Sequence, residues 1–273
     1  FRRVQRGEKP GFPRFKSKQR FRSFTYPQNG FHLSGSRLFL SKIGAIKIKL
    51  HRPPRGKVKT CTISVKNGKY YACFSCEVEP NLLPSSSECV GIDLGLASLA
   101  VTSDGKFIEA PKIFQRNEQK IKRKQQQISR KVPGSKRRRK AVRQLALLHE
   151  KLANQRRDHA HKSSRELVNQ YGFIAFEDLN VHNMIKNHRF AKSIADAGWN
   201  QLVQFIAYKA ESAGRVIVRV SPSNTSQDCS NCNQPVKKSL AVRIHRCPYC
   251  GYEANRDVNA ARNILKRALA AAS

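Results

Sequence analysis

The chain has 273 residues, and its 53 Lys and Arg against 18 Asp and Glu give a formal charge of +35. This charge excludes most ordinary metabolic enzymes and predicts a polyanionic partner. The 39% of apolar residues are enough for a buried core, and without a long apolar run or a leader we expect an intracellular protein with no membrane partner.

The first 50 residues mix Arg and Lys with aromatic residues, which suits nucleic acid because cations meet phosphates and rings stack on bases. The alternative is that the rings form the core of strands, which aromatic residues also favour. Residues 38–50 and 59–78 predict strands with polar turns such as Asn67-Gly68, in a β-rich module that ends near residue 87. The aromatic residues are Phe1, Phe12, Phe15, Phe21, Phe24, Tyr26, Phe31 and Phe39.

Residues 88–108 predict three short strands, with Asp93 at the end of the first and an Asp104-Gly105 turn after the second. A helical pattern follows over 115–171, and Pro133-Gly134 divides it into two antiparallel helices. Glu118 is nearly the only acid among their basic runs, so a phosphate backbone is their natural counterpart. We predict nucleic-acid contacts from Arg123, Lys124, Arg130, Lys131, Arg137, Arg138 and Arg139.

The rest of the chain adds two more acids to the ends of predicted elements. An apolar strand over 173–176 ends in Glu177-Asp178, and Asp257 lies in the first turn of the last helix, where acids are common. Between them we predict an amphipathic helix over 190–213, with Trp199 in the core, and a strand over 215–220.

The eight cysteines divide into two groups by their spacing. Two C-x-x-C pairs fourteen residues apart predict a tetrahedral Zn²⁺ site that is structural, because four thiolates leave no open position. Each C-x-x-C pair forms a tight turn, here called a knuckle. The residue after each knuckle is Asn233 or Gly251, and both tolerate the positive φ of such a turn. We interpret Cys61, Cys73, Cys76 and Cys89 as small packing residues, and predict Cys229, Cys232, Cys247 and Cys250 as the zinc ligands.

The order of elements predicts an α/β fold that resembles the RNase H-like fold. In that fold the first strand, the fourth strand and the last helix would bring Asp93, Glu177 and Asp257 together. Three such carboxylates repel one another unless divalent cations lie between them, so we expect Mg²⁺ or Mn²⁺ and phosphodiester hydrolysis. Strand alternation lets only one of Glu177 and Asp178 face this site.

Several motifs together resemble the TnpB family, the RNA-guided nucleases of bacterial insertion sequences, which are related to compact type V CRISPR effectors. The resemblance extends from about residue 30 to the end of the chain. It implies a RuvC-type site with Asp93, Glu177 and Asp257 as catalytic acids, which selects Glu177 over Asp178, and a zinc ribbon. The motifs are Gly91-Ile-Asp93-Leu-Gly95, Phe176-Glu177-Asp178-Leu179-Asn180-Val181, Thr225-Ser-Gln-Asp-Cys229-Ser-Asn-Cys232, Cys247-Pro-Tyr-Cys250-Gly251 and Asn255-Arg-Asp257-Val-Asn259-Ala-Ala.

The resemblance also implies a domain order for this chain. Since Phe1 is not an initiator Met, we expect that the start of the wedge domain and the recognition helices are missing. The expected parts are a wedge-like β-rich RNA-binding module (1–87), RuvC part I (88–114), a basic helical hairpin insertion (115–172), RuvC part II (173–222), the zinc ribbon (223–252) and RuvC part III (253–273).

These implications predict an RNA-guided DNA endonuclease of a transposable element. Its partners would be a guide RNA and target DNA, and its location the cytoplasm of a bacterial host. One alternative is a truncated regulator that binds RNA or DNA without cutting. Another is a transposase that transfers strands.

Overall fold

The computed structural model describes residues 5, 7, 17, 21–188, 190–239 and 242–272. The chain divides into two compact units, Phe1–Glu79 and Pro80–Ser273. The predictions made for Phe1, Phe12 and Phe15 lie outside the described residues.

The first unit contains two three-stranded antiparallel sheets. The β5–β6 hairpin turns through Asn67 and Gly68, whose φ angles of 51° and 76° suit a tight hairpin turn. The small core of the first unit contains Leu38, Leu40 and Cys61. One sheet has the order β1 (Ser23–Tyr26), β5 (Lys57–Lys66), β6 (Lys69–Glu77), and the other β2 (Phe31–Ser34), β3 (Arg37–Leu40), β4 (Gly44–Lys47).

The predictions for this unit hold in part. Phe31 packs against the core, as a strand residue would, whereas Phe24 and Phe39 are exposed. Cys61 is buried as predicted, but Cys73 is exposed, and so is Cys89 at the start of the second unit. The packing role predicted for these two is therefore wrong. Cys73 lies on the exposed face of β6, whose alternate residues are the more buried ones.

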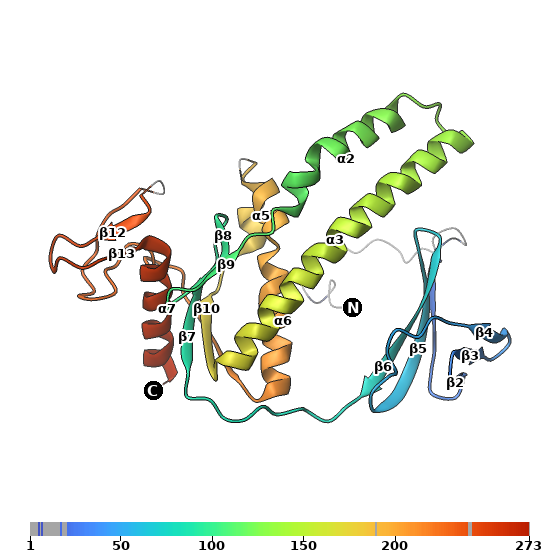
Figure 1. Cartoon of the computed structure of the whole chain (residues 1–273), viewed down its shortest axis with the longest axis horizontal. Helices are drawn as coiled ribbons and strands as arrows, with labels where there is room; N and C mark the ends of the chain where they lie inside the picture. Colours follow the sequence, from blue (N-terminus) through green and yellow to red (C-terminus); the bar gives the residue numbers. More distant parts are fainter. Residues whose placement is uncertain are drawn as a thin grey trace. The chain divides into compact units, whose positions relative to one another are not determined.

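The second unit is built on one five-stranded mixed sheet (Figure 1). β7, β8 and β9 pair antiparallel, while β10 pairs parallel with both β7 and β11. This agrees with the predicted α/β class and its mixed sheet. The sheet order is β11 (Val216–Val220), β10 (Phe173–Glu177), β7 (Cys89–Asp93), β8 (Ser98–Thr102), β9 (Phe107–Glu109).

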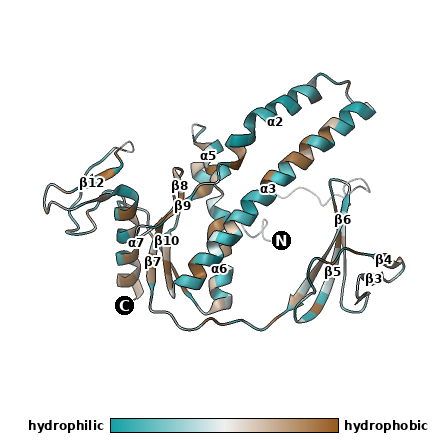
Figure 2. Ribbon diagram, viewed as in Figure 1, coloured by the Kyte–Doolittle hydropathy of each residue, from teal (hydrophilic) through white to brown (hydrophobic). Residues whose placement is uncertain are grey.

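The helices of this unit follow its strands along the chain, and the first of them is α2. Figure 2 shows α2 as largely hydrophilic. The single helix predicted over 190–213 is wrong, because Gly198 has a φ of 68° and separates two helices there. Trp199 is buried in the core as predicted. The helices are α2 (Ile113–Ser129), α3 (Lys136–Gln170), α4 (Val181–Met184), α5 (Ala191–Ala197), α6 (Trp199–Ala213) and α7 (Arg256–Ala272); β12 (Ile244–Arg246) and β13 (Glu253–Asn255) form a separate ribbon.

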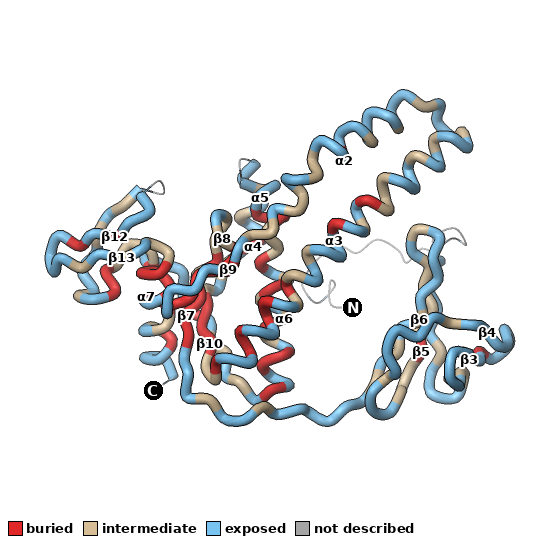
Figure 3. Tube along the Cα trace, viewed as in Figure 1, coloured by how far each residue is buried: buried red, intermediate tan, exposed pale blue. Residues whose placement is uncertain are grey.

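Strand alternation divides the side chains of the sheet between two faces. Val90, Ile92, Ile174 and Phe176 face the main core, which also includes residues of α3 and α6. Figure 3 shows buried stretches in β7, β10 and α6, whereas much of α3 is exposed or intermediate. The residues between them face α7, since Ala175 packs with residues of that helix. Asp93 and Glu177 continue this second series, so both acids project from the face that α7 covers.

Gly91 allows α7 to approach β7 closely. A Cβ atom at Gly91 would lie 2.1 Å from the carbonyl oxygen of Ala261 and 2.7 Å from the backbone nitrogen of Leu265. Both atoms belong to the helix backbone, which cannot move aside as a flexible side chain can. A glycine is therefore required where the strand and the helix cross.

We expect Gly91→Ala to lower the free energy of unfolding of this unit by about 3 kcal/mol, because it overpacks the contact with α7. Urea unfolding measures the change. Gly134→Ala is the control, since this loop glycine has open space around it and a φ of 78°. It should cost only about 1 kcal/mol, for the left-handed backbone. Equal losses in the two variants would contradict the contact.

Candidate active site and zinc centre

The three predicted acids meet where two strands end and one helix begins. β7 and β10 run parallel with Ile92 opposite Phe176, so the next residues, Asp93 and Glu177, lie at matching ends of neighbouring strands. Asp257 lies in the first turn of α7, which packs on the same face of the sheet. The helix begins there because the side-chain oxygen of Asn255 accepts hydrogen bonds from the backbone N–H groups of Asp257, at 2.9 Å, and Val258, at 3.4 Å.

The charges of Glu177 and Asp257 act on Asp93. Burial raises the pKa of Asp93 to about 8, with further increases from the charges of Glu177 and Asp257 and an opposing effect from Arg256. Burial also raises the pKa of Glu177, against a hydrogen bond from Thr225 and the charge of Arg267. Asp178, the rejected neighbour of Glu177, is instead exposed, with Arg219 at 3.5 Å. The structure thus places Glu177 and Asp257 near enough to Asp93 to raise its pKa, although the three carboxylates are not a group of described residues whose oxygens all lie within reach of one ion.

We expect the magnesium-free chain to lose stability as the pH rises from about 4 to about 8. Asp93 is protonated in the folded state up to a pKa of about 8, whereas an unfolded Asp ionises near pH 3.9. Within this window the folded state binds more protons, so stability falls as the pH rises. Thermal unfolding of the wild type and Asp93→Asn across the window measures the effect. A constant difference between the two midpoints would contradict it.

A stripe of polar residues on α7 binds the segment from the end of β11 to the first zinc knuckle. Asn259, Asn263 and Arg267 are spaced by four residues and therefore share one face of the helix. Asn259 donates to Asp228 O at 2.8 Å and accepts from the Ser230 N–H at 2.9 Å. The sequence interpretation assigned no role to these residues, although their spacing is a signal that it could have used.

The four predicted zinc ligands come together. Among the described residues, they are the one group of three or more possible ligands whose ligand atoms are close enough to share an ion, all within 4.8 Å of one another. The sulfurs of Cys229 and Cys250 are 3.7 Å apart, and those of Cys232 and Cys247 3.5 Å. Zn–S bonds of about 2.3 Å in a tetrahedron place sulfurs about 3.8 Å apart, so these residues fit Zn²⁺.

The backbone around the sulfurs supports the same interpretation. The Tyr252 backbone N–H is the leading cause that lowers the pKa of Cys250, to about 6, and so favours the thiolate that binds metal. Asn233 and Gly251 have φ angles of 61° and 71°, which confirms the positive φ predicted after each knuckle. The chemistry of the site therefore matches a structural zinc ion.

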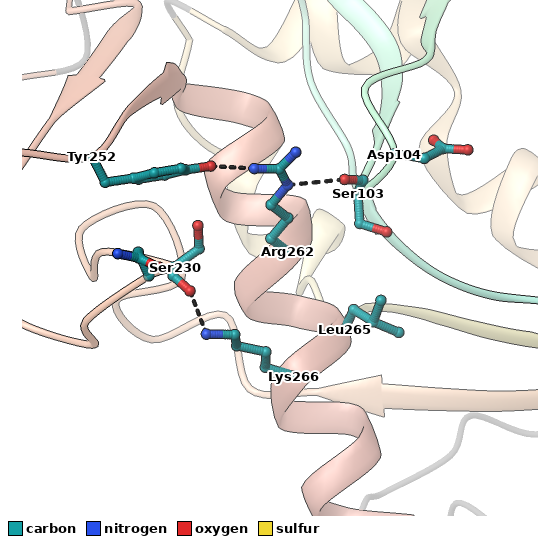
Figure 4. Close-up of a pocket in the computed structure, with 8 residues that line it drawn as sticks. Ser103, Asp104, Ser230, Tyr252, Arg262, Leu265 and Lys266 are labelled. Atoms are coloured by element: carbon teal, nitrogen blue, oxygen red, sulfur yellow. Dashed lines mark hydrogen bonds between the residues drawn. The ribbon is translucent and has the colours of Figure 1, made fainter.

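Figure 4 shows how α7 joins the zinc ribbon to the sheet. Around a pocket of about 320 Å³, the Arg262 guanidinium donates to Ser103 O at 3.1 Å and to the Tyr252 hydroxyl. The Lys266 ammonium donates to Ser230 O beside it. The helix that carries Asp257 thus contacts both the residue after β8 and the ribbon.

The basic residues predicted to contact nucleic acid lie around the α2–α3 connection. The two helices pack through a small apolar cluster of Ile121, Leu148 and Leu152. Asp196 of α5 holds the start of α2, since its carboxylate accepts from the Phe114 N–H at 2.9 Å. Four of the seven side chains are exposed and three are partly exposed: Arg123, Arg130, Arg137 and Arg139, then Lys124, Lys131 and Arg138.

None of the helices in the described ranges combines the length and the apolar composition that crossing a bilayer requires.

Two family descriptions match successive parts of the chain. The family OrfB_IS605, described as "Probable transposase", matches residues 73–188. The family described as "Cas12f1-like, TNB domain" matches residues 199–264. Together they cover most of the second unit, including all three acids.

Similar proteins extend the match to nearly the whole chain. "Putative RNA-guided DNA endonuclease InsQ" of Escherichia coli (strain K12) is 38% identical, over 94% of this chain and 69% of that protein. A protein of Streptomyces pristinaespiralis with the same description, but without the name InsQ, is 37% identical over 96% of this chain and 67% of its own length. A cryo-electron microscopy structure of a CRISPR-Cas12f ternary complex has a similar fold, with a TM-score of 0.53 and 20% identity. It covers 77% of this chain, which spans only 46% of that one. On these similarities, the chain belongs to the TnpB and InsQ family of RNA-guided DNA endonucleases.

Proposed function

We propose that this chain is an RNA-guided endonuclease of a transposable element, which cuts target DNA by metal-dependent phosphodiester hydrolysis. The observation that carries the proposal is the meeting of three acids with interacting charges, Asp93, Glu177 and Asp257. All three acids are half-buried, and carboxylates that repel one another form a poor core but a good site for divalent cations. The mixed sheet with α7 on the face of the acids would then be a RuvC-type nuclease core.

The three carboxylates would hold Mg²⁺ or Mn²⁺, since hard cations prefer oxygen ligands. Bound there, such ions supply Lewis-acid stabilisation of the scissile phosphate and activation of water. Asp93 and Glu177 must be ionised to bind them, which Arg256 and Arg267 respectively favour. Among the described residues the three carboxylates are not a group whose oxygens all lie close enough to share one ion, so the proposal rests on their positions at the strand and helix ends and on the effect of Glu177 and Asp257 on Asp93.

The rest of the chain would bind the nucleic acids. The basic residues near the α2–α3 connection suit phosphate backbones, while base pairing with the guide RNA would supply the sequence specificity. The first unit would be the wedge-like RNA-binding module, and residues 223–252 the structural zinc ribbon. We also propose a location in the bacterial cytoplasm, which the Escherichia coli relative and the nucleic-acid partners support.

The test is to purify the chain from cells that carry its own gene and flanking DNA, and to sequence the RNA that stays bound. We expect a defined RNA from the flank, and Mg²⁺-dependent cleavage of DNA that matches its guide segment. DNA with a scrambled match is the control. Defined RNA without cleavage would favour the non-cleaving regulator instead. Joined transposon ends would favour the strand-transferring transposase.

A further inference from the structure

Thr225 contacts Glu177 of the candidate active site, and the proposed function gives this threonine no role. It lies in the loop between β11 and the first zinc knuckle, is 2% exposed, and donates its hydroxyl hydrogen to Oε1 of Glu177. The other acceptor within reach is the carbonyl oxygen of Pro222, at 3.2 Å. A hydroxyl has one hydrogen to donate, and the charged carboxylate is the stronger acceptor.

The position of Thr225 is determined by α7 from both sides. The Asn263 side chain donates to Thr225 O at 2.9 Å and to Asp228 O at 2.8 Å. Before Thr225, the guanidinium of Arg267 donates to the carbonyl oxygens of Ser221 and Ser223. The same guanidinium binds the Asp228 carboxylate at 2.8 Å. The loop is thus bound at four residues, and the buried hydroxyl has little freedom to turn away.

Glu177 needs such a constraint more than the other acids do. A Glu side chain has one more rotatable bond than an Asp, so its carboxylate is less well fixed by the backbone. Metal-binding carboxylates are commonly oriented by a hydrogen bond to one oxygen, which leaves the other for the ion.

We propose that Thr225 is a positioning residue for Glu177, which holds one carboxylate oxygen so that the other faces the divalent cation. The inference rests on the proposed function, because it takes Glu177 as a metal ligand. It also links the zinc ribbon to the acids, since Cys229 follows Thr225 by four residues and anchors the far end of the same loop.

Thr102 provides a matched control within the same sheet. It is fully buried, and its hydroxyl also donates to a carboxylate, that of Asp104. Thr102 pairs with Ile92, which faces the main core, so its hydroxyl lies on the opposite face of the sheet from Glu177. Thr102→Val therefore removes a comparable hydrogen bond to a carboxylate, together with the one that the hydroxyl accepts from the Lys106 N–H at 3.0 Å, without touching the three acids.

The experiment measures Mn²⁺ binding to the zinc-loaded full chain by electron paramagnetic resonance, beside the Mg²⁺ dependence of cleavage. We expect Thr225→Val to weaken Mn²⁺ binding by about 10- to 100-fold, as loss of such a supporting contact typically does. Thr225→Ser, which keeps the hydroxyl, should restore the affinity. Thr102→Val should leave it unchanged. Zinc content and circular dichroism report whether each variant is folded.

The outcomes separate this inference from the proposed function. If Asp93→Asn abolishes Mn²⁺ binding but Thr225→Val does not weaken it, Thr225 has no positioning role and the nuclease proposal stands. Equal weakening in Thr225→Val and Thr102→Val would also overturn the inference, because it would show general destabilisation. If Thr225→Val loses Mn²⁺ binding but the wild-type chain cuts no guide-matched DNA, the positioning role is supported and the endonuclease proposal is overturned. If Asp93→Asn binds Mn²⁺ as tightly as the wild type, both the positioning role of Thr225 and the proposed nuclease site are overturned.

Discussion

Asp93→Asn is expected to lower the rate of Mg²⁺-dependent cleavage of guide-matched DNA by at least about a thousandfold, with binding of the guide RNA unchanged. The amide keeps the size of the side chain but loses the charge that would hold the cation between β7 and α7. A thousandfold loss corresponds to about 4 kcal/mol of transition-state stabilisation, within the several kcal/mol that a bound metal contributes. Single-turnover cleavage and RNA gel-shift assays measure the two quantities.

Asp178→Asn is the matched control for this result. Asp178 follows Glu177 directly, but it is exposed and lies beside Arg219, outside the group of interacting acids. The variant should therefore keep most of the wild-type cleavage rate. Cleavage that survives in Asp93→Asn, or that falls equally in Asp178→Asn, would remove the three acids from the mechanism.

Cys247→Ser is expected to unfold the zinc ribbon while the sheet of the second unit remains folded. The ribbon has only the two short strands β12 and β13, and an isolated two-stranded sheet is marginally stable in water. Zinc binding in comparable small sites supplies about 10 to 16 kcal/mol, far more than so small a core. Hydrogen exchange of residues 229–252 should become fast, and the zinc content should fall from one ion per chain.

The control for zinc binding is Cys73→Ser, which replaces an exposed cysteine of the first unit. Its zinc content and the exchange of the ribbon should match those of the wild type. A ribbon that stays protected in Cys247→Ser after chelation would show that its side chains, and not the metal, hold it together.

Local signals in the sequence predicted most of the elements. The break at Pro133-Gly134 gave two helices, and the structure has them as α2 and α3. Two knuckles, each closed by a short turn, predicted the zinc ligands, because a turn of four residues brings its two sulfurs together whatever the rest of the chain does. The prediction of one helix over 190–213 failed because it passed over a local signal, the glycine at position 198. Gly198 interrupts an amphipathic pattern that continues on either side of it.

The contacts around the acids are of a different kind. Glu177 and Thr225 are separated by 48 residues, and Arg262 and Ser103 by 159. Neither pair has a spacing that could reveal it, because each contact exists only once α7 and the loop before the zinc ribbon are packed on the sheet. The same is true of Gly91. The close approach that leaves no space for a Cβ atom there exists only when α7 lies against β7.

Composition and short-range spacing were enough to predict the strong positive charge, the zinc ligands, the basic hairpin and the family motifs. Each of these depends on composition or on residues close together in the chain. The projection of Asp93 and Glu177 from the face covered by α7, and the contact of Thr225 with Glu177, became visible only in the folded unit. Side-chain orientation at a strand end and contacts between distant segments depend on register and packing across the whole unit, which no short stretch of sequence contains.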